Sequence, residues 1–396
     1  MSATTSPAPR SNPTSSNVDD ALPAHTPWVR DQPQITTKEE WRSWMQHVRD
    51  APARPERLTR RQRDRLGDLA RGEYDLARLT YHSQFGPIRH RDFINVHDEI
   101  LALAHDNWLT RSPTAWPFAL IDGQASLGKS TLALYIAYVY EQRMREHYGV
   151  AGDVAPDDYV PVLVCTLDSA MTVKGLDRSL ATFYCPPDRR SRSGDEYRHL
   201  VLECARRCGT TLIILDDLHN LLPRRRNHDE VSGHIKCLMN QLPATFVYVG
   251  INCTVLLNEG HQAHELHLAQ NSSRAHVYSL DLYSLDTTED AQEWTSLIAS
   301  FANHLVLADR PTDLWKKHAQ YLHQRTNGQM NALQLLLRRS ANRAIRNGTE
   351  KIDRRLMDSV KLPKTAETHA WAVGWRPGEG ARNPRVDRRT QISSAR

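Results

Sequence analysis

The sequence predicts an α/β fold in which a parallel five-stranded sheet is covered by helices and followed by an all-helical domain. Short runs of Val, Ile and Leu alternate with helical stretches, a pattern typical of parallel strands that are buried on both faces. After Thr287 the strand pattern ends. The five expected strands are residues 116–121, 160–166, 211–216, 245–250 and 276–282.

Helical stretches complete the expected fold. The helix expected at residues 131–148 has its apolar residues on one face, as required for packing against a sheet. Beyond Thr287 the apolar residues continue with helical spacing, which favours a lid domain made of helices. The four expected lid helices are residues 287–305, 311–326, 328–347 and 352–360.

Segments of different composition flank these two domains. The first is rich in Ser, Thr, Pro and Ala, which is typical of a disordered tail. Thr37 and Glu40 then fit a capping box, so we expect a helix that either packs on the main domain or docks a partner protein. The last segment has a net charge of +4. We expect, in chain order, a disordered tail, an N-terminal helical segment, the α/β domain, the helical lid and a flexible basic tail at residues 1–35, 36–80, 81–286, 287–362 and 363–396.

Composition and charge exclude several classes of protein. Hydrophobic residues make up 40% of the 396 residues, which excludes a wholly disordered chain. No run approaches the ~20 apolar residues of a membrane helix, so we expect no membrane contact. Six cysteines in so long a chain are not a disulfide framework, and we expect a reducing cytoplasm. The net charge of +5 is compatible with nucleic acid without requiring it.

Residues 123–130 match G-x-x-x-x-G-K-[ST], the pattern of a phosphate-binding P-loop. The glycines let backbone N–H groups point at phosphate oxygens, and the positive end of the following helix adds to the attraction. Lys129 is expected to contact the β- and γ-phosphates, and Ser130 to bind Mg²⁺. The residues predicted to bind ATP are Gly123, Gln124, Ala125, Ser126, Leu127, Gly128, Lys129, Ser130 and Thr131.

Two acidic residues follow the third apolar run. Asp216 is expected to hold Mg²⁺ with Ser130, because an apolar strand that ends in an acid lies beside the P-loop strand in such sheets. Asp217 occupies the position that usually activates water, where glutamate is the common residue. Its side chain is one methylene shorter, which predicts slow hydrolysis. Alternatively, Asp217 only caps the following helix.

Two further polar residues lie near the ends of expected strands. Asn252 follows the fourth strand, where it would reach the γ-phosphate and orient the attacking water; a simple turn asparagine is the alternative. Arg274 precedes the fifth strand. An arginine there can stabilise the transition state on a neighbouring subunit, or it is an ordinary surface residue. We therefore consider Asp217, Asn252 and Arg274 the candidate catalytic residues.

These motifs, in this order, resemble the AAA+ ATPases, and more narrowly the TniB/TnsC-type ATPases that assist bacterial DNA transposition. The resemblance runs from about Tyr81 to Val360. The Asp-x-x-His-Asn motif and the Ala-Thr-Phe-Val-Tyr-x-Gly-Ile-Asn motif are more particular to this family than the P-loop. Besides the P-loop, the resemblance rests on Tyr81-His82, on Asp216-Asp-Leu-His-Asn220, and on residues 243–252 and 326–333.

The resemblance implies a role for each motif. Lys129 and Ser130 would bind ATP and Mg²⁺, and Asp216 would be the Walker B acid. Asn252 would sense the γ-phosphate, and Arg274 would be the arginine finger. Members of the family assemble on double-stranded DNA as ATP-dependent rings or filaments, mark the target and recruit a transposase. The implied partners are therefore a second copy of the chain, nonspecific duplex DNA and a transposase.

Three positions depart from the family's pattern. Asp217 stands where glutamate is usual, and Ser273-Arg274-Ala275 stands where Gly-Arg-Phe is usual. The segment Gly328–Asn331 contains no arginine, although many AAA+ proteins carry a second sensor there. We therefore expect ATP binding together with slow hydrolysis.

Basic residues in two loops are candidates for DNA contact. Arg224, Arg225 and Arg226 lie shortly after Asp217, in a loop that would face the central channel of a ring. Lys174 lies in the other such loop, after the second strand. These side chains would neutralise phosphates without reading sequence, so binding would be salt-sensitive. The alternative is a solvated basic loop.

Other functions stay open from the sequence. One is a signalling NTPase switch that its helical half holds closed, and another is a helicase loader or replication initiator. The first usually carries a repeat or effector domain, and the second a helix-turn-helix or a helicase-docking segment; the sequence shows none of these clearly. A scaffold that binds ATP and barely hydrolyses it is the third alternative, because of Asp217.

Overall fold

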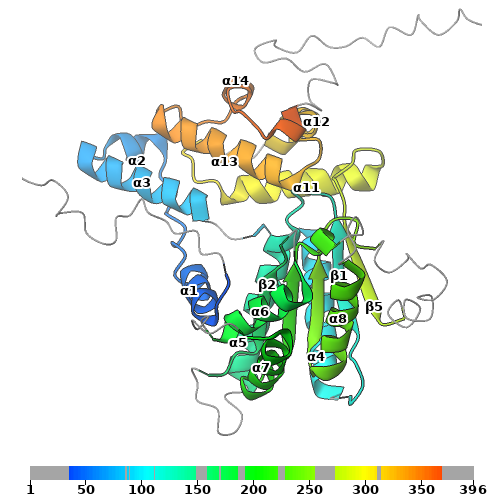
Figure 1. The fold of residues 1–396 in the computed structure, drawn as a ribbon. Helices are drawn as coiled ribbons and strands as arrows, with labels where there is room; N and C mark the ends of the chain where they lie inside the picture. The colour runs from blue at the N-terminus through cyan, green and yellow to red at the C-terminus, as the bar shows by residue number, and fades with distance from the viewer. Residues whose placement is uncertain are drawn as a thin grey trace, which may run out of the picture. The chain divides into compact units, whose positions relative to one another are not determined.

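We describe the fold from a computed structural model (Figure 1). Residues 1–34 of the tail expected at residues 1–35, and most of the expected basic tail, lie outside the described residues. The residues that the structure describes are 35–84, 87–88, 90–110, 112–148, 158–168, 171–185, 192–221, 228–254, 273–309 and 314–367.

Five parallel strands form one sheet with the order β2-β3-β4-β1-β5. The P-loop strand β1 therefore lies between β4 and β5, and β3 separates β4 from β2. Because all strands run the same way, their carboxyl ends meet at one edge, where ligands bind in such sheets. The strands are β1 (Phe118–Gly123), β2 (Val162–Thr166), β3 (Leu212–Asp216), β4 (Thr245–Val249) and β5 (Ala275–Leu280).

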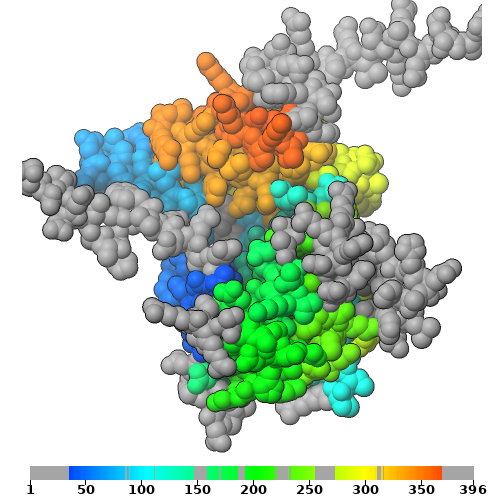
Figure 2. Space-filling view, in the orientation of Figure 1, coloured from blue at the N-terminus to red at the C-terminus, as the bar shows by residue number. Residues whose placement is uncertain are grey.

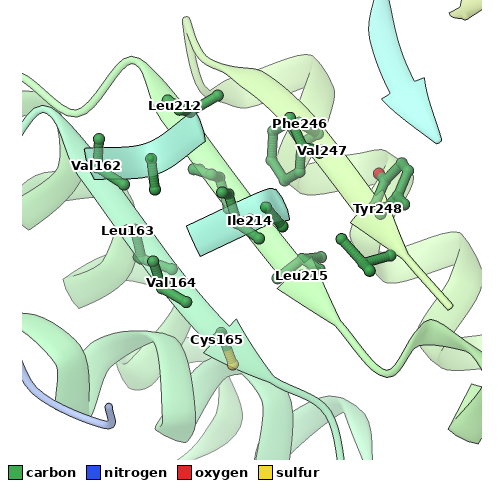
Figure 3. Packing of buried hydrophobic residues seen from close by; sticks show 14 of the residues in the cluster. Val162, Leu163, Val164, Cys165, Leu212, Ile214, Leu215, Phe246, Val247 and Tyr248 are labelled. Atoms are coloured by element: carbon green, nitrogen blue, oxygen red, sulfur yellow. The ribbon is translucent and has the colours of Figure 1, made fainter. Parts of the chain in front are cut away.

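The strands β1 to β4 are buried as their apolar sequences predict, whereas the edge strand β5 is largely exposed and only its last residue, Leu280, is buried. Every residue of β4, and all but the last residue of β2 and β3, is buried. Figure 3 shows side chains of these neighbouring strands, among them Val164, Ile214 and Phe246, packed against one another. The predicted fold class, a parallel five-stranded sheet covered by helices, is confirmed.

Two groups of helices cover the sheet. The helices α4 and α5 contact each other and the sheet, and α6 contacts both α7 and α8. Within α5, Leu132 and Ile136 are fully buried, as their helical spacing predicts. These helices are α4 (Arg91–Thr110), α5 (Lys129–Tyr148), α6 (Val173–Tyr184), α7 (Gly194–Arg207) and α8 (His228–Gln241).

The helices after β5 have a hydrophobic core of their own. Trp294, Phe301 and Leu333 are buried in this second core, which is separate from the core of the sheet. Among the described residues, no helix is long and apolar enough to cross a membrane. The helices are α11 (Thr288–His304), α12 (Leu314–Thr326), α13 (Met330–Arg346) and α14 (Arg354–Asp358).

The N-terminal segment divides between the two cores. Helix α1 (Lys38–Arg49) has the expected capping box, and the fully buried Trp41 donates from its indole Nε1 to Glu141 Oε2 of α5 at 2.5 Å. Helices α2 (Arg60–Asp64) and α3 (Asp68–Gln84) follow. Helix α3 lies beside α13 (Figures 1 and 2). Because α3 extends to Gln84, the boundary expected between residues 80 and 81 lies inside this helix.

A buried ion network holds α2 and α3 on the lid. The fully buried Glu350 accepts hydrogen bonds from both terminal nitrogens of Arg78, at 2.7 and 2.8 Å. It also accepts one from the backbone N–H of Ala308 at 3.0 Å and pairs with Arg63 Nε at 3.1 Å. Buried charges are stable only when paired and hydrogen-bonded in this way. The network therefore makes α2 and α3 part of the helical domain.

Candidate functional site

The P-loop connects β1 to α5 with backbone angles that few residues adopt. Gly123, Ser126 and Gly128 have positive φ values of 149°, 69° and 87°. A Cβ atom on Gly123 would lie 2.3 Å from the carbonyl oxygen of Leu280, at the end of β5. Only glycine therefore lets the end of β5 approach the loop so closely.

Lys129 is the first residue of α5 and is buried beneath the loop. Its Nζ donates to the carbonyl oxygens of Gly123 at 2.7 Å and Gln124 at 2.6 Å. Burial lowers the pKa of Lys129, and the nearby carboxylates of Asp122 and Asp216 oppose that shift. The ammonium group is therefore held inside the curve of the loop, where the motif requires it for phosphate binding.

Asp216 is the last residue of β3, at the same edge of the sheet as the P-loop. Burial raises the pKa of Asp216, while a hydrogen bond from the Ser130 side chain and one from the backbone N–H of Asp217 favour its charged form. The structure thus brings a carboxylate and a hydroxyl together beside the P-loop. These are hard oxygen donors of the kind that Mg²⁺ prefers, so the residues present fit ATP with Mg²⁺.

Asp217 has left-handed backbone geometry, with φ of 59°. Its carbonyl oxygen accepts the N–H of Asn220 at 2.9 Å, in the 3₁₀ turn Leu218–Leu221. The Asp217 carboxylate also acts electrostatically on Lys129, so the two side chains lie near each other. Aspartate is enriched in this conformation because its short side chain tolerates it. That tolerance is a physical reason for aspartate at a position where glutamate is usual.

Asn252 lies just beyond β4, in a turn at the same sheet edge, and is exposed with φ of 52°. The neighbouring Gly250 donates its N–H to Ile121 O of β1 at 3.1 Å. The structure therefore brings Asn252 to the edge where the P-loop and Asp216 lie.

Asp122, immediately before the P-loop, is a residue to which the sequence analysis gave no role. Its Oδ1 accepts the backbone N–H groups of Gly123 at 2.9 Å and Cys253 at 3.0 Å. Its Oδ2 accepts the Thr254 hydroxyl at 3.2 Å. This carboxylate ties the turn of Asn252 to the P-loop. Its place directly before the first glycine was the only signal in the sequence.

Arg274 lies at the opposite end of the strands. Its carbonyl oxygen accepts the N–H of Phe118, the first residue of β1, at 3.0 Å, and its guanidinium donates to Ala115 O at 3.3 Å. The P-loop begins at the other end of β1. Arg274 therefore lies too far along β1 to contact a nucleotide bound by its own P-loop. This position is compatible with both earlier alternatives, an action on a neighbouring subunit and an ordinary surface arginine.

Of the residues predicted to contact DNA, only Lys174 lies among the described residues. Lys174 is exposed in the first turn of α6, whose N-cap is Thr172. Arg224, Arg225 and Arg226 lie outside the described residues.

The remaining residues predicted to bind ATP differ in exposure. Gln124, Ala125 and Thr131 are exposed, whereas Leu127 is buried.

The sheet order and the P-loop, with Asp216 on β3, define an AAA+ ATPase. Residues 83–265 match the family model described as "Bacterial TniB protein". This stretch contains the P-loop, Asp216, Asp217 and Asn252, so the resemblance expected from the motifs is confirmed for the matched residues, which are of the TniB type. No curated protein matches the chain.

The chain also matches solved structures, with low TM-scores and low identities. Cdc6p of Pyrobaculum aerophilum has a TM-score of 0.48 at 19% identity, covering 69% of this chain and 67% of that one. The ORC2 protein of Aeropyrum pernix has a TM-score of 0.47 at 13% identity, covering 72% of this chain and 70% of that one. The ORC1 protein of the same organism, solved in complex with DNA, has a TM-score of 0.45 at 17% identity, covering 73% and 66%.

Proposed function

We propose that this AAA+ protein binds ATP, assembles on duplex DNA as an oligomer in an ATP-dependent way, and regulates DNA transposition by marking a target and recruiting a transposase. The observation that carries this proposal is the TniB match over the same residues that form the nucleotide site. ATP binding would offset the cost of ordering the subunit interface, so hydrolysis would favour release.

The chain's own residues support nucleotide binding and cleavage. Lys129 and the backbone N–H groups of the P-loop would hold the β- and γ-phosphates, and Ser130 and Asp216 would hold Mg²⁺. When bound, the metal supplies charge neutralisation on the phosphate oxygens. Asp217 would accept a proton from the attacking water, and Asn252 would orient that water.

Nonspecific contact with duplex DNA is the second part of this proposal. The exposed Lys174 and the three arginines of residues 224–226 would face the duplex in a ring. Replacing Arg224, Arg225 and Arg226 together by alanine is expected to weaken binding equally for all sequences and to lower its salt dependence. Unchanged DNA affinity at low salt would show that this loop is merely solvated.

Electron microscopy tests the assembly directly. The full chain is mixed with duplex DNA and a slowly hydrolysed ATP analogue, and a matched sample contains the Lys129→Ala variant. We expect rings or filaments on DNA for the unmodified protein and none for the variant, because the variant lacks the cation that binds the phosphates. Monomers without retained DNA in both samples would contradict the proposal.

A further inference from the structure

Asp122 is a buried carboxylate that joins two segments of the nucleotide edge. It lies in β1, directly before the first glycine of the P-loop, and only 9% of it is exposed. Its Oδ1 accepts the backbone N–H groups of Gly123 at 2.9 Å and Cys253 at 3.0 Å. Its Oδ2 accepts the Thr254 hydroxyl at 3.2 Å. One side chain therefore contacts both the P-loop and the turn that contains Asn252.

The part of β1 before Asp122 is apolar and buried. A carboxylate at such a place costs free energy unless hydrogen bonds replace its water. Three donors do so here, and two of them come from the turn after β4. An apolar residue would continue the strand, but it would leave the buried N–H of Cys253 without this acceptor. The carboxylate is therefore matched to the turn rather than to the strand.

The turn of Asn252 is held at both of its ends by consecutive residues of β1. At its start, Gly250 donates its N–H to Ile121 O at 3.1 Å. At its end, the fully buried Cys253 donates its N–H to Asp122. Asn252 lies between these two anchors, with its backbone in the left-handed region at φ of 52°. The bonds to Asp122 therefore fix the backbone of Asn252 relative to the P-loop.

We propose that Asp122 is a positioning residue for ATP hydrolysis, which holds Asn252 where it can orient the attacking water. This inference rests on the proposed function, in which Asn252 orients that water. Asp122 acts through the turn, since its oxygens already accept the three donors. A displacement of about 1 Å in such positioning can lower a rate about 10²-fold. We therefore expect Asp122 to control ATP turnover far more than ATP affinity.

Variants of Asp122 separate turnover from affinity. Asp122→Ala removes all three contacts, and we expect DNA-stimulated phosphate release to fall about 10- to 100-fold. Its affinity for a fluorescent ATP analogue should stay within about threefold, because the variant keeps Lys129 and the P-loop backbone. Asp122→Asn keeps an Oδ1 acceptor and offers an NH₂ group to the Thr254 hydroxyl oxygen. This conservative variant should retain most of the turnover.

A milder variant and a matched control guard against a simple loss of stability. Thr254→Val removes only the bond to Oδ2, and we expect turnover to fall roughly 2- to 10-fold. Asn107 is the control, because its buried side chain donates to Pro117 O and to Thr245 Oγ1, both at 2.9 Å, at the amino ends of β1 and β4. Asn107→Ala loses comparable bonds far from the P-loop, so its folded protein should keep the unmodified turnover. Equal losses in Asn107→Ala and Asp122→Ala would overturn the inference.

A double-mutant cycle tests whether Asp122 acts through Asn252. Asn252→Ala removes the amide that orients the water, so Asp122→Ala should cause little further loss of turnover in that background. Thr254→Val should behave in the same way. Losses that multiply would show that the residues act independently, and the inference would be wrong.

The outcomes separate this inference from the proposed function. If Asp122→Asn loses as much turnover as Asp122→Ala, the charge acts rather than the position, and the inference alone fails. If ATP affinity falls in parallel with turnover, Asp122 only supports the P-loop, and again the inference alone fails. Full turnover in Asn252→Ala, or an unmodified protein that binds ATP without hydrolysing it, would contradict the hydrolysis step of the proposed function and this inference with it.

Discussion

The nucleotide edge is the place where the backbone departs most from ordinary geometry. Five described non-glycine residues have positive φ, and three of them, Ser126, Asp217 and Asn252, lie in the candidate site. Such conformations cost of order 1 kcal/mol or more each and persist where the surrounding structure holds them. Strained residues of this kind cluster at ligand-binding sites, in agreement with the location of the candidate site.

Asp217→Asn tests the role of this residue in hydrolysis. Asparagine tolerates the same left-handed backbone, so the fold and ATP affinity should persist. The amide cannot accept a proton, and we expect ATP turnover to fall by roughly 10²- to 10⁴-fold. Steady-state phosphate release in the presence of DNA measures the ATP turnover of the variant and of the unmodified protein. Unchanged turnover would favour the alternative in which Asp217 only shapes the start of the 3₁₀ turn.

At the scale of elements, one close contact joins the end of the sheet to the lid. Gly328, with φ of 64°, lies between α12 and α13, and a Cβ atom there would lie 2.1 Å from the carbonyl oxygen of Tyr283. The N–H of Tyr283 donates to Gly328 O at 3.1 Å. The Tyr283 hydroxyl in turn donates to His90 Nδ1 at 2.6 Å, before α4. This contact places the chain after β5 against the lid.

Gly328→Ala is therefore expected to destabilise the protein by roughly 2 kcal/mol or more, through the positive φ and the backbone clash. Gly72→Ala is the matched control, because Gly72 lies inside α3 with open space around it. That substitution should stabilise the protein by about 0.5–1 kcal/mol. Urea unfolding of both variants measures the difference. Equal effects would contradict the described contact.

The contact between α3 and the lid predicts a pH dependence. Burial lowers the pKa of His82 to about 4. Its Nε2 accepts the N–H of Val306 at 2.9 Å, which leaves Nδ1–H to donate to Asn342 Oδ1 at 3.0 Å. Protonation of Nε2 would remove the first of these bonds. Since the unfolded chain binds the proton more tightly, stability is full above about pH 6.5 and falls as the pH falls toward 4.

This loss should amount to about 1–3 kcal/mol for His82. His82→Gln should make the dependence of the unfolding free energy on pH shallower between pH 6.5 and 4. Part of the slope should persist, because burial also lowers the pKa of His90 to about 4. His47, exposed on α1, is the control, and His47→Gln should leave the slope unchanged. An unchanged slope in His82→Gln would contradict a neutral buried His82.

At the scale of the whole molecule, the sequence predicted those parts that depend on local patterns. Apolar runs located all five strands. The P-loop motif from Gly123 to Ser130, and the apolar run that ends at Asp216, indicated the candidate nucleotide site, because each of these patterns spans only a few residues. Contacts between distant residues have no such signal. The pairing of Arg78 with Glu350, which assigns α3 to the lid, and the hydrogen bonds from Cys253 and Thr254 to Asp122 depend on the tertiary fold.

In the proposed function, nucleotide at the P-loop controls binding to DNA. Fluorescence anisotropy with a labelled duplex, at fixed salt, measures it most directly for the unmodified protein and for Lys129→Ala. We predict that a slowly hydrolysed ATP analogue increases DNA affinity at least about tenfold in the unmodified protein, or about 1.4 kcal/mol, and has no effect on the variant. Equal DNA affinity with and without the analogue, in an unmodified protein that binds it, would contradict the account.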